Sequence, residues 1–180
     1  MITAADPISR YRRLIEQVDA MIADLEAIHR DFMRCRAGCC QCCTLTSVLA
    51  IEAAVLGRAV ARLPDTMRRR LGQGEGEVCP LLIDSRCAVY AERPLICRTH
   101  GLPIGYVDHD KETVAVSACP VNFPADYAFA LEELLLLDRV NEELAAVNLF
   151  YCRQRGLAPE RRIAMIGIVA GTGFFVAGGY

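Results

Sequence analysis

Cysteine is the residue type whose number and spacing in this sequence point to chemistry. The 180-residue chain contains 10 cysteines, and five of them, Cys35, Cys39, Cys40, Cys42 and Cys43, fall within nine residues. Packing offers no reason for this density, because alanine or valine fills small apolar spaces equally well. We therefore interpret the run as a source of thiolate ligands for a metal.

Four more cysteines follow on separate segments. Two of them, Cys79 and Cys119, precede prolines, which hold the cysteine backbone extended. Because no histidine lies in the tight run, ligation by thiolates alone favours an iron–sulfur cluster or zinc over magnesium, calcium or manganese. The adjacent Cys42 and Cys43 project in different directions, which suits a polynuclear cluster or two adjacent sites better than one tetrahedral ion.

The predicted metal ligands are the cysteines of these segments other than Cys40: Cys35, Cys39, Cys42, Cys43, Cys79, Cys87, Cys97 and Cys119. The expected cofactor is an iron–sulfur cluster, with [4Fe–4S] preferred, or zinc. Cys40 is either a metal ligand or a packed side chain, and we keep both interpretations. The isolated Cys152 lies in a segment that helical packing already explains, so we predict that it is not a ligand.

Other polar residues near the cysteines have two readings each. His100 is a ligand or proton carrier, or an ordinary loop histidine. Arg93 and Arg98 either offset thiolate charge or form a surface ion pair with Glu92.

The remaining histidines and an arginine run receive structural interpretations. We predict that His29 packs on the apolar side of a helix and that His109 lies at a loop tip. The arginines at 68–70 are interpreted as a solvated helix face.

The cysteine motifs resemble those of a known family over residues 35–120. They read Cys35-x3-Cys39-x2-Cys42-Cys43, Cys79-Pro80, Cys87-x2-Tyr90-x2-Arg93-Pro94-x2-Cys97-Arg98 and Cys119-Pro120, and they are similar to the bacterial YkgJ-type cysteine-cluster family. That family is described as a zinc- or iron-chelating domain and is often labelled an iron–sulfur oxidoreductase. The resemblance implies metal binding, but the helices outside the matched stretch receive no support from it.

Two functional classes follow from the resemblance. Flagellin lysine methylase is similar in its cysteine motif and implies that an iron–sulfur centre can serve methyl transfer in this group. The protein is therefore expected to be an iron–sulfur oxidoreductase or a methyltransferase-like enzyme, or else a non-catalytic zinc- or iron-chelating module with a structural or metal-handling role.

The spacing Cys35-x3-Cys39-x2-Cys42 also occurs in radical S-adenosylmethionine enzymes. These enzymes usually place an aromatic residue just before the third cysteine, where this chain has Gln41. They also need a parallel α/β barrel, which the length and helical pattern of this chain cannot supply. We therefore reject this assignment.

Composition limits the partners and the compartment. The 53% of hydrophobic residues indicates a globular protein. Its net charge of −2 gives no overall positive electrostatic potential that would attract nucleic acid. The N-terminal residues lack the apolar run of a secretory signal, so we expect a cytoplasmic protein, where clustered thiols bind metal more often than they form disulfides. The apolar tract 163–176 is too short for a membrane span and contains three glycines.

Helical periodicity dominates both ends of the chain. Asp6-Pro7 predicts the start of a long amphipathic helix over 7–33, and the Leu-rich pattern predicts another over 125–155. Between them we expect a helix over 47–63 and a short helix over 65–71.

The centre of the chain is expected to hold loops and hairpins. A glycine-rich loop is predicted at 72–77, a hairpin around Asp84-Ser85, and a second hairpin from 104–107 and 113–116. The predicted fold class is mainly α, with long amphipathic helices around an irregular cysteine-rich centre and one or two small β-hairpins. We expect one domain, 1–180, whose metal-binding core at 35–120 is flanked by helices 7–33 and 125–155.

Overall fold

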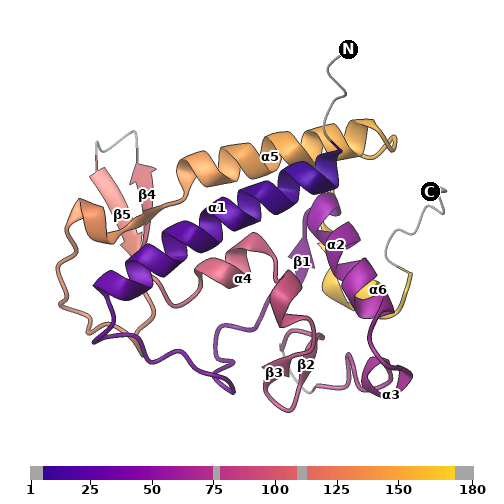
Figure 1. Ribbon diagram of the computed structural model, residues 1–180, viewed down its shortest axis with the longest axis horizontal. Helices are drawn as coiled ribbons and strands as arrows, with labels where there is room; N and C mark the ends of the chain where they lie inside the picture. Colours follow the sequence, from indigo (N-terminus) through magenta and orange to yellow (C-terminus); the bar gives the residue numbers. More distant parts are fainter. Residues whose placement is uncertain (1–5, 75–77, 109–112, 173–180) are drawn as a thin grey trace. The chain divides into compact units, whose positions relative to one another are not determined.

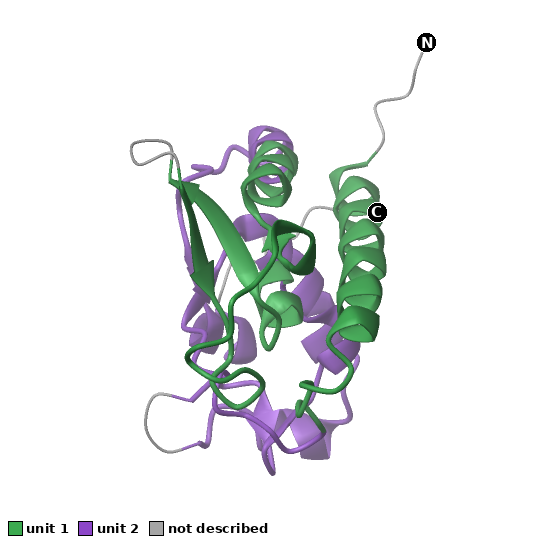
Figure 2. Cartoon of the chain, turned by 90° about the vertical axis from the view of Figure 1, so that its left-hand side faces the viewer, with its two compact units in different colours: residues 1–36, 95–147 green, residues 37–94, 148–180 purple. Residues whose placement is uncertain are grey.

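The fold is that of a computed structural model, which describes residues 6–74, 78–108 and 113–172 (Figure 1). The chain divides into two compact units (Figure 2). The first contains residues 1–36 and 95–147, and the second contains residues 37–94 and 148–180. Each unit therefore draws on two stretches that are distant in the sequence.

The first unit contains the long helix α1, Pro7–Ile28. It begins where the sequence predicts, because the Asp6 carboxylate accepts a hydrogen bond from the Ser9 N–H at 3.1 Å and proline occupies the first turn. Its apolar stripe is buried, and α4, Leu95–Thr99, packs against it. The buried stripe consists of Ile8, Tyr11, Leu14, Ile15, Val18 and Leu25.

Helix α1 ends at Ile28 rather than at Met33. His29 closes the helix, since its N–H donates to the Leu25 carbonyl at 2.9 Å. The buried His29 ring contacts the Glu133 carbonyl oxygen through Nε2 at 2.9 Å and meets the Phe123 ring edge-on. The prediction that His29 is a packed residue is confirmed, and this anchor explains why the helix stops there.

A small sheet completes the first unit, in the order β5-β4-β6. Strands β4, Ile104–Asp108, and β5, Thr113–Ser117, pair antiparallel and confirm the second predicted hairpin. Strand β6, Leu135–Leu136, pairs with β4 in parallel. The tip of the hairpin, with the predicted loop position of His109, lies outside the described residues.

The last long helix is shorter than predicted. Helix α5 covers Asp138–Arg153, whereas the periodicity predicts a helix from 125. Residues 125–137 instead form turns, the 3₁₀ turn η2, Leu131–Glu133, and strand β6. Here the pairing of β6 with β4 satisfies the backbone while Leu134, Leu135 and Leu137 are buried, so tertiary pairing overrides the helical pattern.

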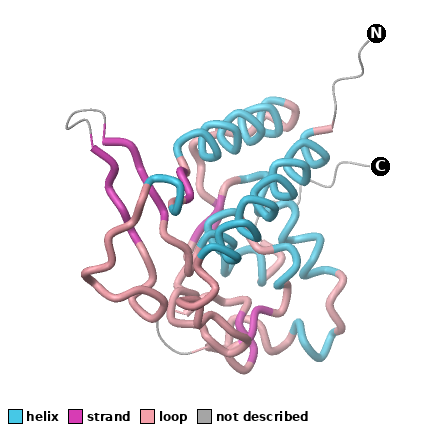
Figure 3. The backbone as a smooth tube through the Cα atoms, turned by 60° about the vertical axis from the view of Figure 1, so that its left-hand side comes forward, coloured by secondary structure: helices cyan, strands magenta, loops and turns pink. Residues whose placement is uncertain are grey.

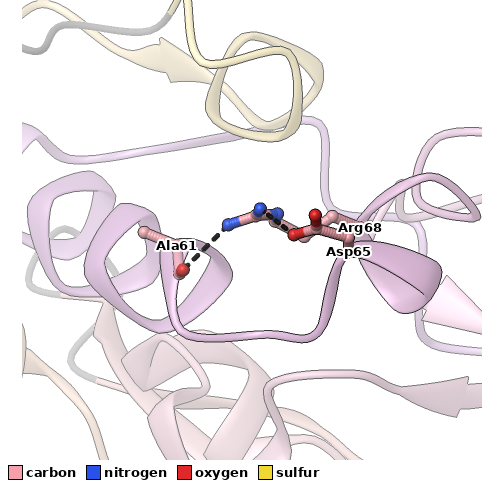
Figure 4. Close-up of polar contacts among 3 residues, drawn as sticks. All are labelled: Ala61, Asp65 and Arg68. Carbon is pink, nitrogen blue, oxygen red and sulfur yellow. Dashed lines mark hydrogen bonds and ion pairs between the residues drawn. The ribbon is translucent and has the colours of Figure 1, made fainter.

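The second unit is built around helix α2, Ala50–Ala61, which follows strand β1, Ser47–Val48. The short α3, Asp65–Arg68, comes directly after it. Arg68 forms an ion pair with Asp65 and donates to the Ala61 carbonyl at 3.0 Å, so it satisfies a free carbonyl at the end of α2 (Figure 4). In the same run, Arg70 pairs with Asp84 at 2.6 Å. These arginines are helix-end and surface partners, as the solvated-face interpretation expects.

Strand β1 pairs antiparallel with β7, Ile163–Ala164, and α6, Met165–Val169, packs on α2. The Met165 N–H also donates to the Thr46 carbonyl at 2.8 Å. Inside this unit, the buried Asn148 side chain accepts from the Ile51 N–H and donates to the Pro159 carbonyl. The segment just after the cysteine run is thus held by residues near the C-terminal end of the described chain.

Helical segments account for 44% of the described residues, and small sheets accompany them (Figure 3). The structure is therefore mixed α/β with small sheets, and the prediction of a mainly α fold is wrong to that extent. Short strands pair across long sequence distances, which a pattern read along the chain cannot detect. Within the described ranges, no helix combines the length and apolar character needed to cross a membrane.

Candidate metal centre

Thiols of the second unit gather around Cys43. Burial, followed by the nearby thiols of Cys42, Cys79, Cys87 and Cys40, raises the pKa of Cys43 to about 12. The Cys79 N–H also donates to the Cys43 carbonyl at 2.7 Å, and this bond joins the cysteine run to the next cysteine segment. The structure therefore brings together five thiols from three segments, which we call the Cys43 group.

Two members of the Cys43 group have backbone partners suited to a thiolate. Burial is the main influence that raises the pKa of Cys79 and of Cys87. In each case a backbone N–H two residues further on, from Leu81 or Val89, opposes this by hydrogen bonding to the sulfur. Such N–H donors stabilise the charged form that binds metal.

The first predicted hairpin positions Cys87. Strands β2, Leu82–Ile83, and β3, Arg86–Cys87, pair so that Cys87 lies opposite Leu82. The turn residues Asp84 and Ser85 have φ of 51° and 59°, and such left-handed conformations at both central positions produce a tight hairpin turn. The turn predicted from this dipeptide is confirmed, and it returns Cys87 toward the segment of Cys79.

Arg93 is the charged neighbour of the Cys43 group. Its guanidinium lies over the Tyr90 ring at 3.6 Å from the ring centre, and its charge lowers the pKa of Cys87. Arg98 behaves differently, because it pairs with Asp19 of α1 through contacts of 2.9 and 2.8 Å. The ion-pair interpretation of Arg98 thus finds a partner in Asp19, and the charge-offset interpretation is supported for Arg93.

The other three predicted ligands, Cys35, Cys97 and Cys119, belong to the first unit. Cys35 is exposed, whereas Cys97 in α4 and Cys119 after β5 are half-buried. Here the buried Asn122 side chain contacts the Cys35 sulfur at 3.5 Å, and its backbone N–H donates to the Cys119 carbonyl at 3.0 Å. Asn122 is a residue that the sequence analysis missed, because a single asparagine outside the cysteine motifs carries no pattern.

The remaining candidates are three cysteines and His100. Cys40 belongs to the Cys43 group, and Cys39 is exposed in the same run. His100 is half-buried, and burial lowers its pKa. Cys152 is fully buried in α5, where its thiol contacts the Asn148 side chain at 3.8 Å.

The donor set fits a thiophilic metal, although it is not drawn together into a finished site. Among the residues that the structure describes, no three His, Cys, Asp or Glu side chains converge as metal ligands would. The other four thiols of the Cys43 group nevertheless lie close enough to disfavour the ionisation of Cys43. A bound cation would replace this repulsion by attraction, so the chemistry of the group suits zinc or iron.

Part of the chain matches a known protein family. Residues 34–120 match the CxxCxxCC family, which is described as a putative zinc- or iron-chelating domain. In this chain the first interval is one residue longer, because three residues lie between Cys35 and Cys39. No curated protein and no solved structure matches the chain. The match confirms the predicted resemblance, and the matched stretch, residues 34–120, includes all eight predicted ligands.

Proposed function

We propose that this protein binds metal through the thiolates of its cysteine segments and that the metal is held as an iron–sulfur cluster. The observation that carries the proposal is the Cys43 group, in which thiols from three segments lie close enough to Cys43 to raise its pKa. The match of residues 34–120 to a zinc- or iron-chelating domain supports metal binding in general. The choice of cluster rests on the number and arrangement of the thiols.

The electrostatics of the metal-free group supports metal capture. A thiol such as Cys43, whose pKa is raised to about 12, is neutral at physiological pH and costs little to keep buried. A metal ion replaces the protons, because coordination requires the thiolate form. The group therefore exchanges protons for a cation without leaving several unpaired charges in a half-buried site.

Two features favour an iron–sulfur cluster over one zinc ion. The adjacent Cys42 and Cys43 cannot both point at a single ion without strain, and the thiols outnumber the four ligands of one tetrahedral site. The amide donors at Cys79 and Cys87, together with the charge of Arg93, are the kinds of contact that tune the potential of such clusters. Zinc chelation is the alternative.

The chemistry of the bound centre defines two functional classes. An iron–sulfur cluster supplies electron transfer, or an iron atom that can bind a small molecule such as S-adenosylmethionine. In that case this protein acts as an oxidoreductase or in group transfer, and Arg93 holds positive charge beside the thiolates. The alternative is a non-catalytic chelating module, whose thiolates close the coordination shell.

Anaerobic purification with metal and sulfide analysis tests the proposal. We expect brown protein with a broad thiolate-to-iron absorption band and acid-labile sulfide. Colourless protein with stoichiometric zinc would refute the cluster, and protein that binds neither metal would refute metal binding altogether.

Substitutions identify the ligands. Cys79→Ser and Cys87→Ser should each lower the metal content, whereas Cys152→Ser, at a buried cysteine beside Asn148, should not. A loss confined to Cys152→Ser would contradict the assignment of the Cys43 group.

Electrochemistry and ligand-titrated spectroscopy of the loaded protein separate enzyme from module. A centre that changes oxidation state or responds to S-adenosylmethionine favours an enzyme. A centre that is silent across the accessible potentials and unchanged by candidate ligands favours the chelating module.

A further inference from the structure

Asn122 is a buried polar residue, 5% exposed, whose side chain uses both ends of its amide. Its Oδ1 accepts a hydrogen bond from the Arg34 N–H at 2.9 Å. Its Nδ2 donates to the Gly101 carbonyl at 2.6 Å and contacts the sulfurs of Cys35 at 3.5 Å and Met33 at 3.6 Å. The side chain thus fixes the backbone on one side of Cys35 and also reaches its sulfur.

The backbone of Asn122 holds a second predicted ligand. The N–H groups of Asn122 and Phe123 donate to the Cys119 carbonyl at 3.0 and 2.9 Å. A single residue therefore connects Cys35, at the end of the first segment of the unit, with Cys119, which follows strand β5. These two cysteines are far apart in the sequence, and no pattern along the chain links them.

The backbone of Gly101 lies close to both Cys35 and Asn122. Its φ is +100°, and a Cβ placed on it would lie 2.8 Å from the Cys35 sulfur and 3.3 Å from Asn122 Nδ2. Contacts of 2.8 Å are essentially never made by a real Cβ, so the backbone approaches Cys35 and Asn122 at a point that only glycine allows. The surroundings therefore fix the Cys35 side chain although it is exposed to solvent.

The side-chain amide of Asn122 can donate a hydrogen bond to a thiolate. A thiolate only accepts hydrogen bonds, and Nδ2 carries two hydrogens. One is directed to the Gly101 carbonyl, which leaves the second for the neighbouring sulfurs of Cys35 and Met33, and a charged thiolate is the stronger acceptor of the two. Donors of this kind orient a metal ligand and favour its charged form.

We propose that Asn122 is a positioning residue for the predicted metal ligand Cys35: it holds Cys35 in place relative to Cys119 and donates an N–H to the Cys35 thiolate when metal is bound. This inference rests on the proposed function, because it requires Cys35 to be a ligand. It assigns no contact with the metal itself to Asn122.

Asn148 provides a matched control. It is 2% exposed, and its amide also bridges two backbone groups, accepting from the Ile51 N–H at 3.2 Å and donating to the Pro159 carbonyl at 2.9 Å. The cysteine that contacts it, Cys152, is not a predicted ligand. Loss of either amide should destabilise the protein similarly, but only the loss of Asn122 should weaken metal binding.

The test compares Asn122→Asp with Asn148→Asp. Both variants keep the volume and the Oδ1 acceptor and remove the N–H donors. Zinc affinity, measured by competition with a chromophoric chelator, should fall about 10–100-fold for Asn122→Asp and less than about twofold for Asn148→Asp. In a Cys35→Ser background, Asn122→Asp should cause no further loss. Equal losses in the two variants, or an undiminished loss in that background, would overturn the proposal.

A measurement on the unmodified protein covers the case in which Asn122→Asp does not fold. The chain has three asparagines, Asn122, Asn141 and Asn148, so labelling with ¹⁵N-asparagine gives three side-chain amide signals. Substitution of Asn141 and Asn148 assigns them. Zinc should shift the Asn122 amide signal and leave that of Asn148 in place, and zinc binding with an unmoved Asn122 signal would refute the inference. A protein that does not bind zinc or iron would instead refute the proposed function.

Discussion

Gly101→Ala perturbs a point where both the backbone and a neighbouring side chain restrict the residue. The φ of +100° is one that L-residues rarely adopt, and the added methyl group would lie 2.8 Å from the Cys35 sulfur. Because that sulfur also contacts Asn122, the methyl group must displace a predicted ligand or the amide that holds it. We therefore expect the substitution to lower both stability and metal affinity.

The expected loss of stability in Gly101→Ala has two parts. The left-handed backbone of a non-glycine residue costs about 1–3 kcal/mol. Forcing a methyl group into the packed contact with Cys35 costs about 1–3 kcal/mol more. Gly38 separates the two parts, because its φ is +95° and a Cβ there would meet nothing within 4 Å. Gly38→Ala should therefore lose only the first part.

Urea denaturation of the metal-free, reduced proteins, followed by circular dichroism, measures both losses. We expect Gly101→Ala to be less stable than Gly38→Ala by about 1–3 kcal/mol. In a Cys35→Ala background, which removes the sulfur, the excess should shrink toward zero. Equal losses at the two glycines, or an excess that persists without the sulfur, would refute the reasoning.

Three further predictions concern charge. Because the pKa of Cys43 is raised to about 12, metal binding must release protons, so zinc affinity should rise with pH between 6 and 9 in chelator competition; a flat profile would contradict this. The folded-state pKa of Cys43 lies above its ordinary value of 9.0, so its contribution to stability is complete below 9 and is lost as pH rises toward 12. Alkaline denaturation should therefore affect the metal-free protein in this range more than the zinc-loaded protein. Arg93→Leu should raise the pKa of Cys87, and the pH profile of thiol alkylation, with Cys87→Ser to identify the site, should move upward; an unchanged profile would remove Arg93 from the group.

Local signals were enough to predict several elements. Asp6 and Pro7 define the start of α1, and Asp84-Ser85 defines the turn that positions Cys87, because each acts on residues next to it in the chain. The cysteine spacing likewise predicted the family. These features depend on the types of residues within a few positions of one another.

Other features depend on partners distant in the sequence. The helix predicted from 125 is replaced by strand β6, whose partner β4 lies about thirty residues earlier. Asn122 was not predicted for the same reason, since Arg34, whose N–H donates to its Oδ1, is 88 residues away. The division of the predicted ligands between two compact units could not be predicted either, because it follows from how distant stretches of chain pack.

The pairing of β1 with β7 has a consequence for the order of events during synthesis. Thr46 and Ser47, which follow the cysteine run, are held by Met165 and Arg162, and the bond between Arg162 and Ser47 spans 115 residues. A growing chain cannot form these bonds until residues 162–165 have left the ribosome. The cysteine run of residues 39–43 therefore emerges early and waits with loosely held thiols. We expect stable metal loading to follow the emergence of residues 162–165, with reducing conditions protecting the thiols until then.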